Sequence, residues 1–197
     1  MLLSAALSAE ELHRVQLVVD IGSRNGSYLF ALAHSCPMAA IRGVELDGGR
    51  RYWTGFRRAD EGEAFARALR ERGRDAKYLW ADFQDLSSDA LDLSGKSSVL
   101  MTLFYPFVSE DPCRSWGLPP QYADFNSLLQ HLQHVSTGNP GSETIIVAAH
   151  QGEWEAELAR KSYAALGFQW IEYKIDQSRF SSLWPSEYDV FLFRITL

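Results

Sequence analysis

Short apolar segments alternate with stretches of helical periodicity along most of this chain. The stretches that favour helices are about 27–34, 49–72, 121–135 and 153–166. The apolar segments predicted to be buried strands are Leu17–Ile21, Ile41–Leu46, Ala76–Trp80, Ser98–Leu103 and Thr144–Ala149. Because strands that alternate with helices are joined by right-handed crossovers, this order favours a mainly parallel sheet with helices on its faces.

The last thirty residues lack this alternation. Phe168–Asp176 and Tyr188–Leu197 resemble strands, and the link at 177–187, which carries Trp184-Pro185, is predicted to be a loop. Since no helix separates them, we expect the two strands to pair antiparallel. The sequence thus predicts a three-layer α/β/α sandwich: a single domain over residues 1–197 with a seven-stranded, mostly parallel sheet and a C-terminal antiparallel hairpin. Ser8 and Glu11 fit a capping box, which predicts a short leading helix at about 8–14.

Composition places the chain among ordinary globular proteins. Hydrophobic residues make up 46% of its 197 residues and charged residues 22%, which argues against disorder. The net charge of −6 argues against non-specific binding to nucleic acid or anionic membranes, although it does not exclude a local basic patch. No segment approaches the roughly 18 apolar residues of a membrane span, and Met1–Leu7 lacks the basic start of a signal peptide. Because Cys36 and Cys113 have no metal-ligand spacing, we expect a cytoplasmic protein without a metal site.

The segment after the first predicted strand carries the clearest functional signal. Gly22 and Gly26 lie in a turn between strand and helix, where glycine lets a ligand approach the backbone. Asp20 ends the apolar strand, and a buried carboxylate there needs a partner such as a cationic ligand group. The glycine spacing does not fit the dinucleotide pattern Gly-x-Gly-x-x-Gly, and Asp20 would repel a phosphate. A positively charged nucleoside fits better.

The second predicted strand also ends in acids. Glu45 follows the glycine turn by about twenty residues, the position from which a carboxylate accepts both hydroxyls of a ribose. Alternatively, Glu45 caps the next helix, a role that we assign to Asp47.

These residues resemble the first motif of the class I S-adenosylmethionine-dependent methyltransferases, a Rossmann-like superfamily. That motif commonly runs Asp/Glu-x-Gly-x-Gly-x-Gly, and Asp20, Gly22 and Gly26 match it, whereas Arg24 replaces the middle glycine. The Arg24 side chain either narrows the cofactor pocket or swings outward. Asn139-Pro140-Gly141 and the terminal hairpin also resemble features of this family.

The resemblance implies S-adenosyl-L-methionine as cofactor. It further implies that Asp82 accepts from the adenine amino group and that Phe83 offers a backbone N–H to the ring. The implied cofactor-binding residues are Asp20, Gly22, Ser23, Gly26, Glu45, Asp82 and Phe83.

The catalytic residues are less clearly marked, because methyl transfer depends mainly on holding the reactants in line. Tyr105 follows the fourth predicted strand. The alternatives for its side chain are to line the acceptor pocket, to hydrogen-bond the cofactor, or to have only a packing role. His150 follows the fifth and is a candidate general base, or a histidine bonded to loop backbone. The long connection Val108–Tyr122 is predicted to cover the acceptor pocket, with Trp116 as a wall; a disordered flap and a partner-binding edge are the alternatives.

The acceptor itself is not named by any motif. Arginines in the predicted helix at 49–72 are interspersed with acids, which is typical of a solvated face rather than of an RNA-binding one. We therefore expect a small-molecule or protein acceptor and no membrane partner, and the sequence leaves the oligomeric state undecided. One alternative is a non-catalytic cofactor sensor or protein-binding module with the same fold. Another is an aminopropyl transferase, but such an enzyme usually needs a cluster of acids to hold a polyamine, and this sequence shows no such cluster near the fourth predicted strand.

Overall fold

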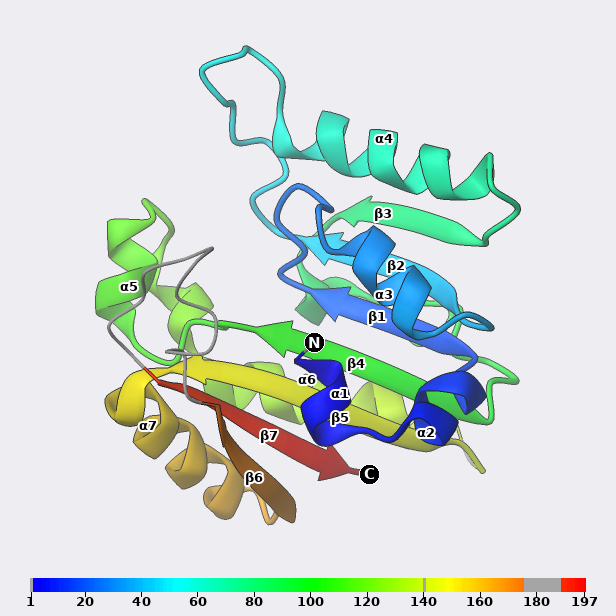
Figure 1. Cartoon of the computed structure of the whole chain (residues 1–197). Helices are drawn as coiled ribbons and strands as arrows, with labels where there is room; N and C mark the ends of the chain where they lie inside the picture. The colour runs from blue at the N-terminus through cyan, green and yellow to red at the C-terminus, as the bar shows by residue number, and fades with distance from the viewer. Residues whose placement is uncertain (1, 140, 176–188) are drawn as a thin grey trace.

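One seven-stranded sheet forms the centre of the molecule in the computed structural model, which describes residues 2–139, 141–175 and 189–197 (Figure 1). Its strands are β1 Leu17–Ile21, β2 Ala40–Glu45, β3 Ala76–Trp80, β4 Ser98–Phe104, β5 Glu143–Gln151, β6 Trp170–Ile175 and β7 Val190–Thr196. Their order is β3-β2-β1-β4-β5-β7-β6; β1 to β5 are parallel, and β7 is antiparallel to β5 and β6. The predicted sheet and hairpin are confirmed, whereas the predicted link at 177–187 lies outside the described residues.

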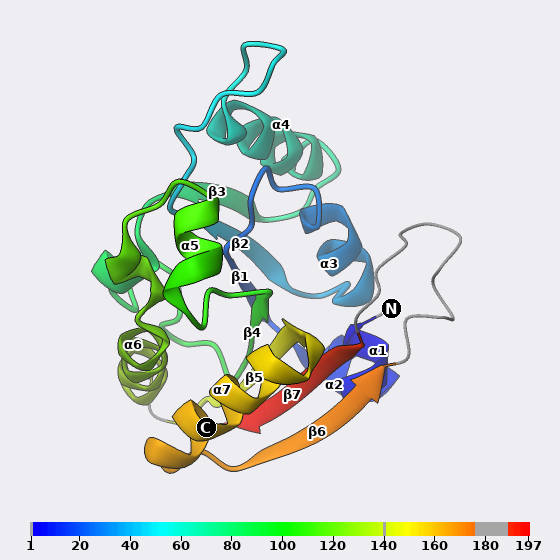
Figure 2. The same cartoon turned by 90° about the vertical axis from the view of Figure 1, so that its left-hand side faces the viewer.

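Helices cover both faces of this sheet. They are α1 Leu3–Ala6, α2 Ala9–Arg14, α3 Leu29–Ser35, α4 Arg58–Arg70, α5 Glu110–Ser115, α6 Phe125–Thr137 and α7 Gly152–Ala165, with 3₁₀ turns η1 Phe83–Asp85 and η2 Pro120–Ala123. Alternate residues of β1 point to opposite sides: Leu17 and Val19 join a core under α6 and α7, and Val18 joins one under α1 to α4. The predicted three-layer sandwich is therefore confirmed (Figures 1 and 2).

The chain's two ends are tied together on one face of the sheet. The Ser8–Glu11 capping box is present: the Glu11 N–H donates to Ser8 Oγ over 3.2 Å, and the Ser8 N–H donates to Glu11 Oε2 over 2.7 Å. Arg194 of β7 donates to Glu11 Oε1 over 2.6 Å. The leading helix thus packs on the sheet rather than over its carboxyl edge.

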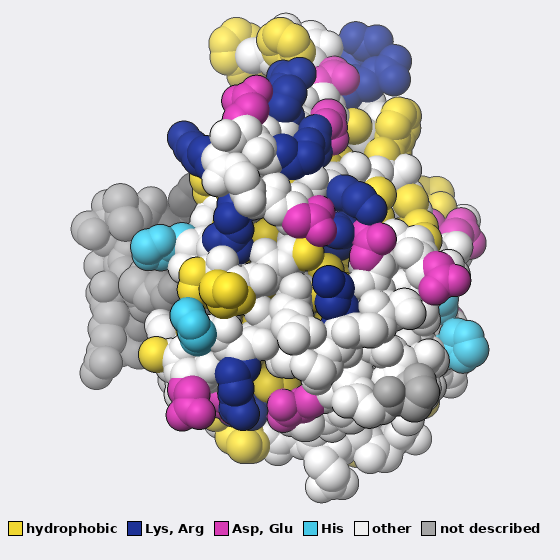
Figure 3. All heavy atoms as spheres, turned by 90° about the vertical axis from the view of Figure 1, so that its right-hand side faces the viewer, with side chains coloured by type: hydrophobic (Ala, Val, Ile, Leu, Met, Phe, Trp, Pro, Cys, Tyr) yellow, Lys and Arg dark blue, Asp and Glu magenta, His cyan; other side chains and the backbone are white. Residues whose placement is uncertain are grey.

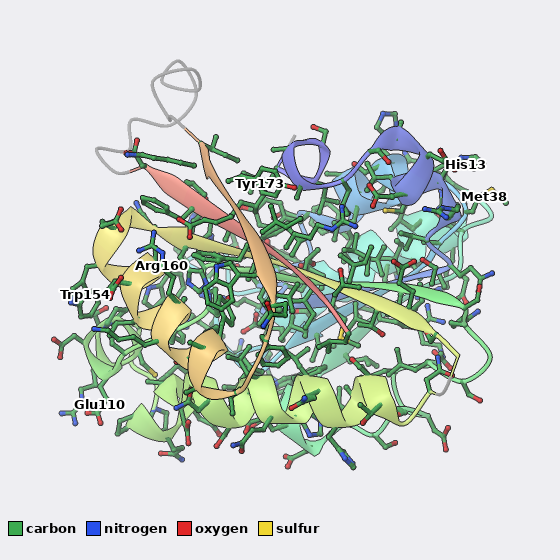
Figure 4. The ribbon with its side chains drawn as sticks, turned by 90° about the horizontal axis from the view of Figure 1, so that it is seen from below. His13, Met38, Glu110, Trp154, Arg160 and Tyr173 are labelled. Atoms are coloured by element: carbon green, nitrogen blue, oxygen red, sulfur yellow. The ribbon has the colours of Figure 1, made fainter. Side chains whose placement is uncertain are left out.

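The terminal hairpin is held to α7 by one arginine. Arg160 donates to both carboxylate oxygens of Glu172 in β6, at 3.0 and 2.7 Å, and its guanidinium lies 5.4 Å from the Phe191 ring of β7. Figure 4 shows Arg160 lying between α7 and the hairpin, whereas Trp154 of the same helix points outward. This link fixes the antiparallel end of the sheet against the helical layer.

The helix predicted over 49–72 begins only at Arg58, which corrects the sequence-based boundary. Before it, residues 50–58 form a small hairpin, in which the Arg58 N–H donates to the Arg50 carbonyl over 3.0 Å and the Tyr52 N–H to the Phe56 carbonyl over 2.9 Å. The turn ends at Gly55, whose φ of 87° few other residues adopt. We call residues 50–58 the arm; it projects beyond α4 in both views (Figures 1 and 2).

Candidate functional site at the carboxyl edge

The candidate site lies where β1, β2 and β4 end, the edge that faces the viewer in Figure 2. Asp20 is 2% exposed there, and its register neighbours are Gly43 of β2 and Thr102 of β4. Thr102 Oγ1 donates to Asp20 Oδ1 over 2.7 Å; the Ser23 hydroxyl lies nearby, but it makes no hydrogen bond of good geometry to Asp20 Oδ2. Burial raises the pKa of Asp20 above its usual range, because water is excluded from the charged form, and the Thr102 and Ser23 hydroxyls oppose that rise.

The two glycines of the following turn have different surroundings. Both have positive φ, 78° at Gly22 and 75° at Gly26. A Cβ on Gly22 would meet nothing within 4 Å, so its backbone faces open space. A Cβ on Gly26 would lie 2.9 Å from the Gly62 Cα of α4. Gly22 therefore leaves its side of the turn open, whereas Gly26 lets α4 pack closely against the turn; that both glycines let a ligand approach stays a prediction.

Ser23 and Arg24 complete this turn. Ser23 is fully buried, and its Oγ would lie 2.8 Å from a Cβ on Gly43, so that glycine makes room for the hydroxyl. Ser23 is thus an internal part of the turn. Arg24 has a φ of 53°, the left-handed region that glycine adopts without strain.

Glu45 links this turn to the one after β2. It is 6% exposed; its Oε2 accepts the Arg24 N–H over 2.7 Å, and its Oε1 accepts the Asp47 N–H over 2.8 Å. Burial raises the pKa of Glu45, and the Arg58 guanidinium 3.7 Å away opposes that change. Since a carboxylate offers about four acceptor positions, Glu45 retains capacity for a further donor.

Asp47 does not cap a helix, contrary to the sequence-based assignment. Its carboxylate pairs with Arg50 and with Arg58, the latter at 3.2 Å. At the start of α4, Asp60 in the first turn accepts the N–H of the N-cap residue Arg57 over 2.8 Å. The arm's two basal arginines are therefore anchored on the acids after β2.

Trp116 lies among three arginines at the same edge. The guanidinium carbons of Arg24 and Arg58 lie 5.3 Å from its ring and that of Arg50 lies at 5.8 Å; Arg50 also donates to the Trp116 carbonyl. The connection at 108–122, which contains α5 and η2, thus reaches the ends of β1 and β2 (Figure 2). Its role as a cover over an acceptor pocket stays a prediction.

The segment after β3 contributes the third group of predicted residues. Asp82 is half-buried, and its Oδ1 accepts the Gln84 N–H over 2.9 Å at the start of η1. The Phe83 side chain is buried edge-on to His131 at 5.2 Å, so only its backbone is available to a ligand. The Ala81 N–H donates to the Glu45 carbonyl over 3.1 Å, which holds this segment beside β2.

Tyr105 and His150, the predicted catalytic residues, occupy different environments. Tyr105 is 42% exposed, has a φ of 61°, and burial of its other parts raises its pKa. His150 is fully buried: its Nε2 lies 3.0 Å from Tyr163 Oη, and the rings of Phe125 and Phe193 pack against it. Burial lowers the pKa of His150 to about 3. A neutral side chain enclosed in this way does not reach an acceptor, so we do not retain it as a base.

Two residues of this site were not predicted. Thr102 is a hydroxyl inside the apolar run 99–104 of β4, and its register with Asp20 is the signal that identifies it. Arg58 is 5% exposed and pairs with both acids after β2, but its sequence position in an arginine-rich stretch did not distinguish it. Among the described residues no cluster of His, Cys, Asp and Glu fits a metal ion, and none of the described helices is long and apolar enough to cross a membrane.

Solved structures match this chain over nearly its full length. A methyltransferase from Geobacter sulfurreducens, in complex with S-adenosyl-L-homocysteine, is 12% identical over 100% of this chain and 90% of its own, with a TM-score of 0.55. A SAM-dependent methyltransferase from Aquifex aeolicus is 12% identical over 94% and 86%, with a TM-score of 0.54. The 16S rRNA methyltransferase KamB is 15% identical over 95% and 91%, with a TM-score of 0.53.

This chain has the class I methyltransferase fold. No protein-family model and no curated protein matches the sequence at a significant level. At these low identities the solved structures establish the fold, and activity within the methyltransferase fold has to be argued from the site.

Proposed function

We propose that this protein is an S-adenosylmethionine-dependent methyltransferase that binds its cofactor at the carboxyl ends of β1 and β2. The observation that carries the proposal is the unpartnered buried oxygen of Asp20, beside a turn whose Gly22 faces open space. A buried carboxylate oxygen without a donor is costly, and a ligand with a cationic amino-acid end compensates for it. A dinucleotide would instead bring a phosphate toward this acid.

The remaining residues fit the same ligand. The free acceptor positions of Glu45 suit ribose hydroxyls, and Asp82 with the Phe83 backbone suits an adenine ring. Ser23 and Gly26 shape the turn from within. When bound, the cofactor supplies an electrophilic methyl group; the chain's part is to exclude water and hold the acceptor in line, and Tyr105 is an exposed polar side chain after β4 that is available for this task.

A non-catalytic cofactor sensor is the second candidate. It is favoured by Arg24 at the position of the family's middle glycine and by the two backbone N–H groups that already occupy Glu45. The sensor would bind the cofactor without turning it over. Overall charge favours a small-molecule or protein acceptor, but it does not describe the surface next to the site.

Calorimetry with S-adenosylhomocysteine tests the proposal. We expect micromolar binding, equivalent to about −8 kcal/mol. Asp20→Asn keeps the acceptor for Thr102 but loses the charge, and Glu45→Gln loses the charge-assisted contacts, so each should weaken binding at least about tenfold. Glu143→Gln, at the exposed start of β5, is the matched control. No binding by the wild-type protein at millimolar ligand would contradict the proposal, and binding without turnover would favour the sensor.

A further inference from the structure

The arm at residues 50–58 exposes aromatic side chains that contribute little to the fold. Trp53 is 97% exposed and Phe56 is 60% exposed. At the foot of the arm Trp80 is 54% exposed; its indole N–H donates to the Leu46 carbonyl over 3.2 Å, and its ring lies so close to Gly48 and Gly49 that a Cβ on either would overlap it. Single exposed aromatics are common, but three around one projecting hairpin indicate a contact surface.

The charge of the arm has one sign. Its sequence, Arg-Arg-Tyr-Trp-Thr-Gly-Phe-Arg-Arg, holds four arginines and no acid, in a chain of net charge −6. Arg50 and Arg58 are anchored on Asp47, whereas Arg51 donates to the Gly55 carbonyl over 3.1 Å and Arg57 lies 6.0 Å above the Trp80 ring. The structure gives neither Arg51 nor Arg57 a carboxylate partner among the described residues.

Other arginines of the chain are arranged differently. On α4, Arg70 pairs with Glu63, and Figure 3 shows basic and acidic side chains interspersed over the face that it draws. Acids therefore accompany the arginines of α4, whereas the arm itself contains no acid. On the arm, two arginines without a carboxylate partner among the described residues, Arg51 and Arg57, flank the exposed rings of Trp53 and Phe56.

From this arrangement we propose that the arm binds single-stranded nucleic acid. Exposed aromatic faces stack on unpaired bases whatever their identity, and arginines neutralise the phosphates between them. Protein interfaces are also rich in aromatic residues and arginine, but four arginines without an acid on one short arm favour a polyanionic partner. The arm is also continuous with the candidate site, because Arg50 and Arg58 contact both Asp47 and the Trp116 ring. That the bound strand is also the methyl acceptor rests on the proposed function.

Fluorescence anisotropy with a labelled mixed-sequence RNA of about 12 nucleotides tests this binding. Trp53→Ala removes a side chain that the fold does not bury, and with Phe56→Ala it should weaken binding at least about tenfold. Arg51→Ala should reduce the slope of log affinity against log salt by about 0.7, the loss of one phosphate contact. Trp154→Ala, an exposed tryptophan on α7 that points outward in Figure 4, and Arg14→Ala, an exposed arginine on α2, should bind like the wild type.

Competing partners are tested in the same assay. DNA of the same sequence distinguishes the two sugars, a duplex tests the need for unpaired bases, and polyglutamate and anionic vesicles test charge alone. Three outcomes would each overturn the proposal. Trp53→Ala could bind RNA as well as the wild type does, or the protein could bind polyglutamate or vesicles more tightly than RNA and DNA. In the third, Trp53→Ala changes the oligomeric state and the protein binds no oligonucleotide. Calorimetry of Trp53→Ala with S-adenosylhomocysteine should match the wild type, so failure of the arm and failure of the cofactor site are separable.

Discussion

At the scale of single residues, burial decides what each titratable group of this molecule can do. Asp20 and His150 both lie near the carboxyl ends of apolar strands, and the sequence suggests a site role for each. Both keep a buried polar atom without a hydrogen bond within the described structure, Asp20 Oδ2 and His150 Nδ1, but Asp20 lies next to an open turn, whereas His150 is enclosed by aromatic rings. Position at the carboxyl edge is therefore not enough; the direction of the side chain from the strand separates a candidate ligand contact from a core residue.

His150 should make folding sensitive to mild acid. Because the folded pKa of about 3 lies below the ordinary 6.5, the unfolded chain takes up a proton first, so stability present above pH 6.5 is lost as the pH falls. Between pH 7.5 and 5.5 this group should remove about 1.4 kcal/mol from the free energy of unfolding. His150→Gln, which keeps a hydrogen-bonding group for Tyr163, should lack that loss in urea denaturation. An equal pH dependence in the variant would contradict the buried, neutral state.

At the scale of elements, the turn between β1 and α3 has one side that is open to a proposed ligand and another that packs against α4. The Gly22 backbone faces open space, whereas Gly26 lies against α4. Two residues of the same type in one motif thus serve separate purposes. The difference arises from the position of α4, whose Gly62 backbone lies against Gly26.

Alanine substitution at the two glycines should separate these purposes. Gly22→Ala meets only the strain of a positive φ, roughly 1–2 kcal/mol, and should mainly weaken S-adenosylhomocysteine binding. Gly26→Ala adds a collision with the Gly62 Cα at 2.9 Å, so it should cost roughly 2–4 kcal/mol of unfolding free energy. Urea denaturation and calorimetry of both variants measure the contrast. If the two lost equal stability, the packing role of Gly26 would be wrong.

At the scale of the whole molecule, the leading helix α2 is joined to the last strand β7 on one face of the sheet. Glu11 of α2 and Arg194 of β7 are separated by nearly the whole chain and meet at 2.6 Å. On the opposite face, Arg160 of α7 joins that helix to Glu172 of β6. The antiparallel end of the sheet is thereby fixed by charged contacts as well as by its apolar core.

The Glu11 contact should matter at neutral pH and disappear in acid. The hydrogen bond from the Ser8 N–H, followed by that from Arg194, lowers the pKa of Glu11 to about 2, so its contribution is present above the ordinary 4.5 and is lost as the pH falls toward 2. Glu11→Gln keeps the capping box but not the charge. After allowance for solvent screening it should cost about 1 kcal/mol at pH 7 and nothing near pH 2. Thermal unfolding against Glu10→Gln, its exposed neighbour, measures the difference.

The local sequence determined the strands, because an apolar run closed by a turn is a signal carried by neighbouring residues; β1 and β3 have the predicted bounds. It also indicated the acids at the ends of β1 and β2. Contacts between distant residues decided the rest. The Trp80 ring packs on Gly48 and Gly49 at the foot of the arm, where periodicity predicted a helix. The sheet register places Thr102 beside Asp20. Such contacts join residues far apart in the chain, so only the folded structure determined which polar groups were left without a partner.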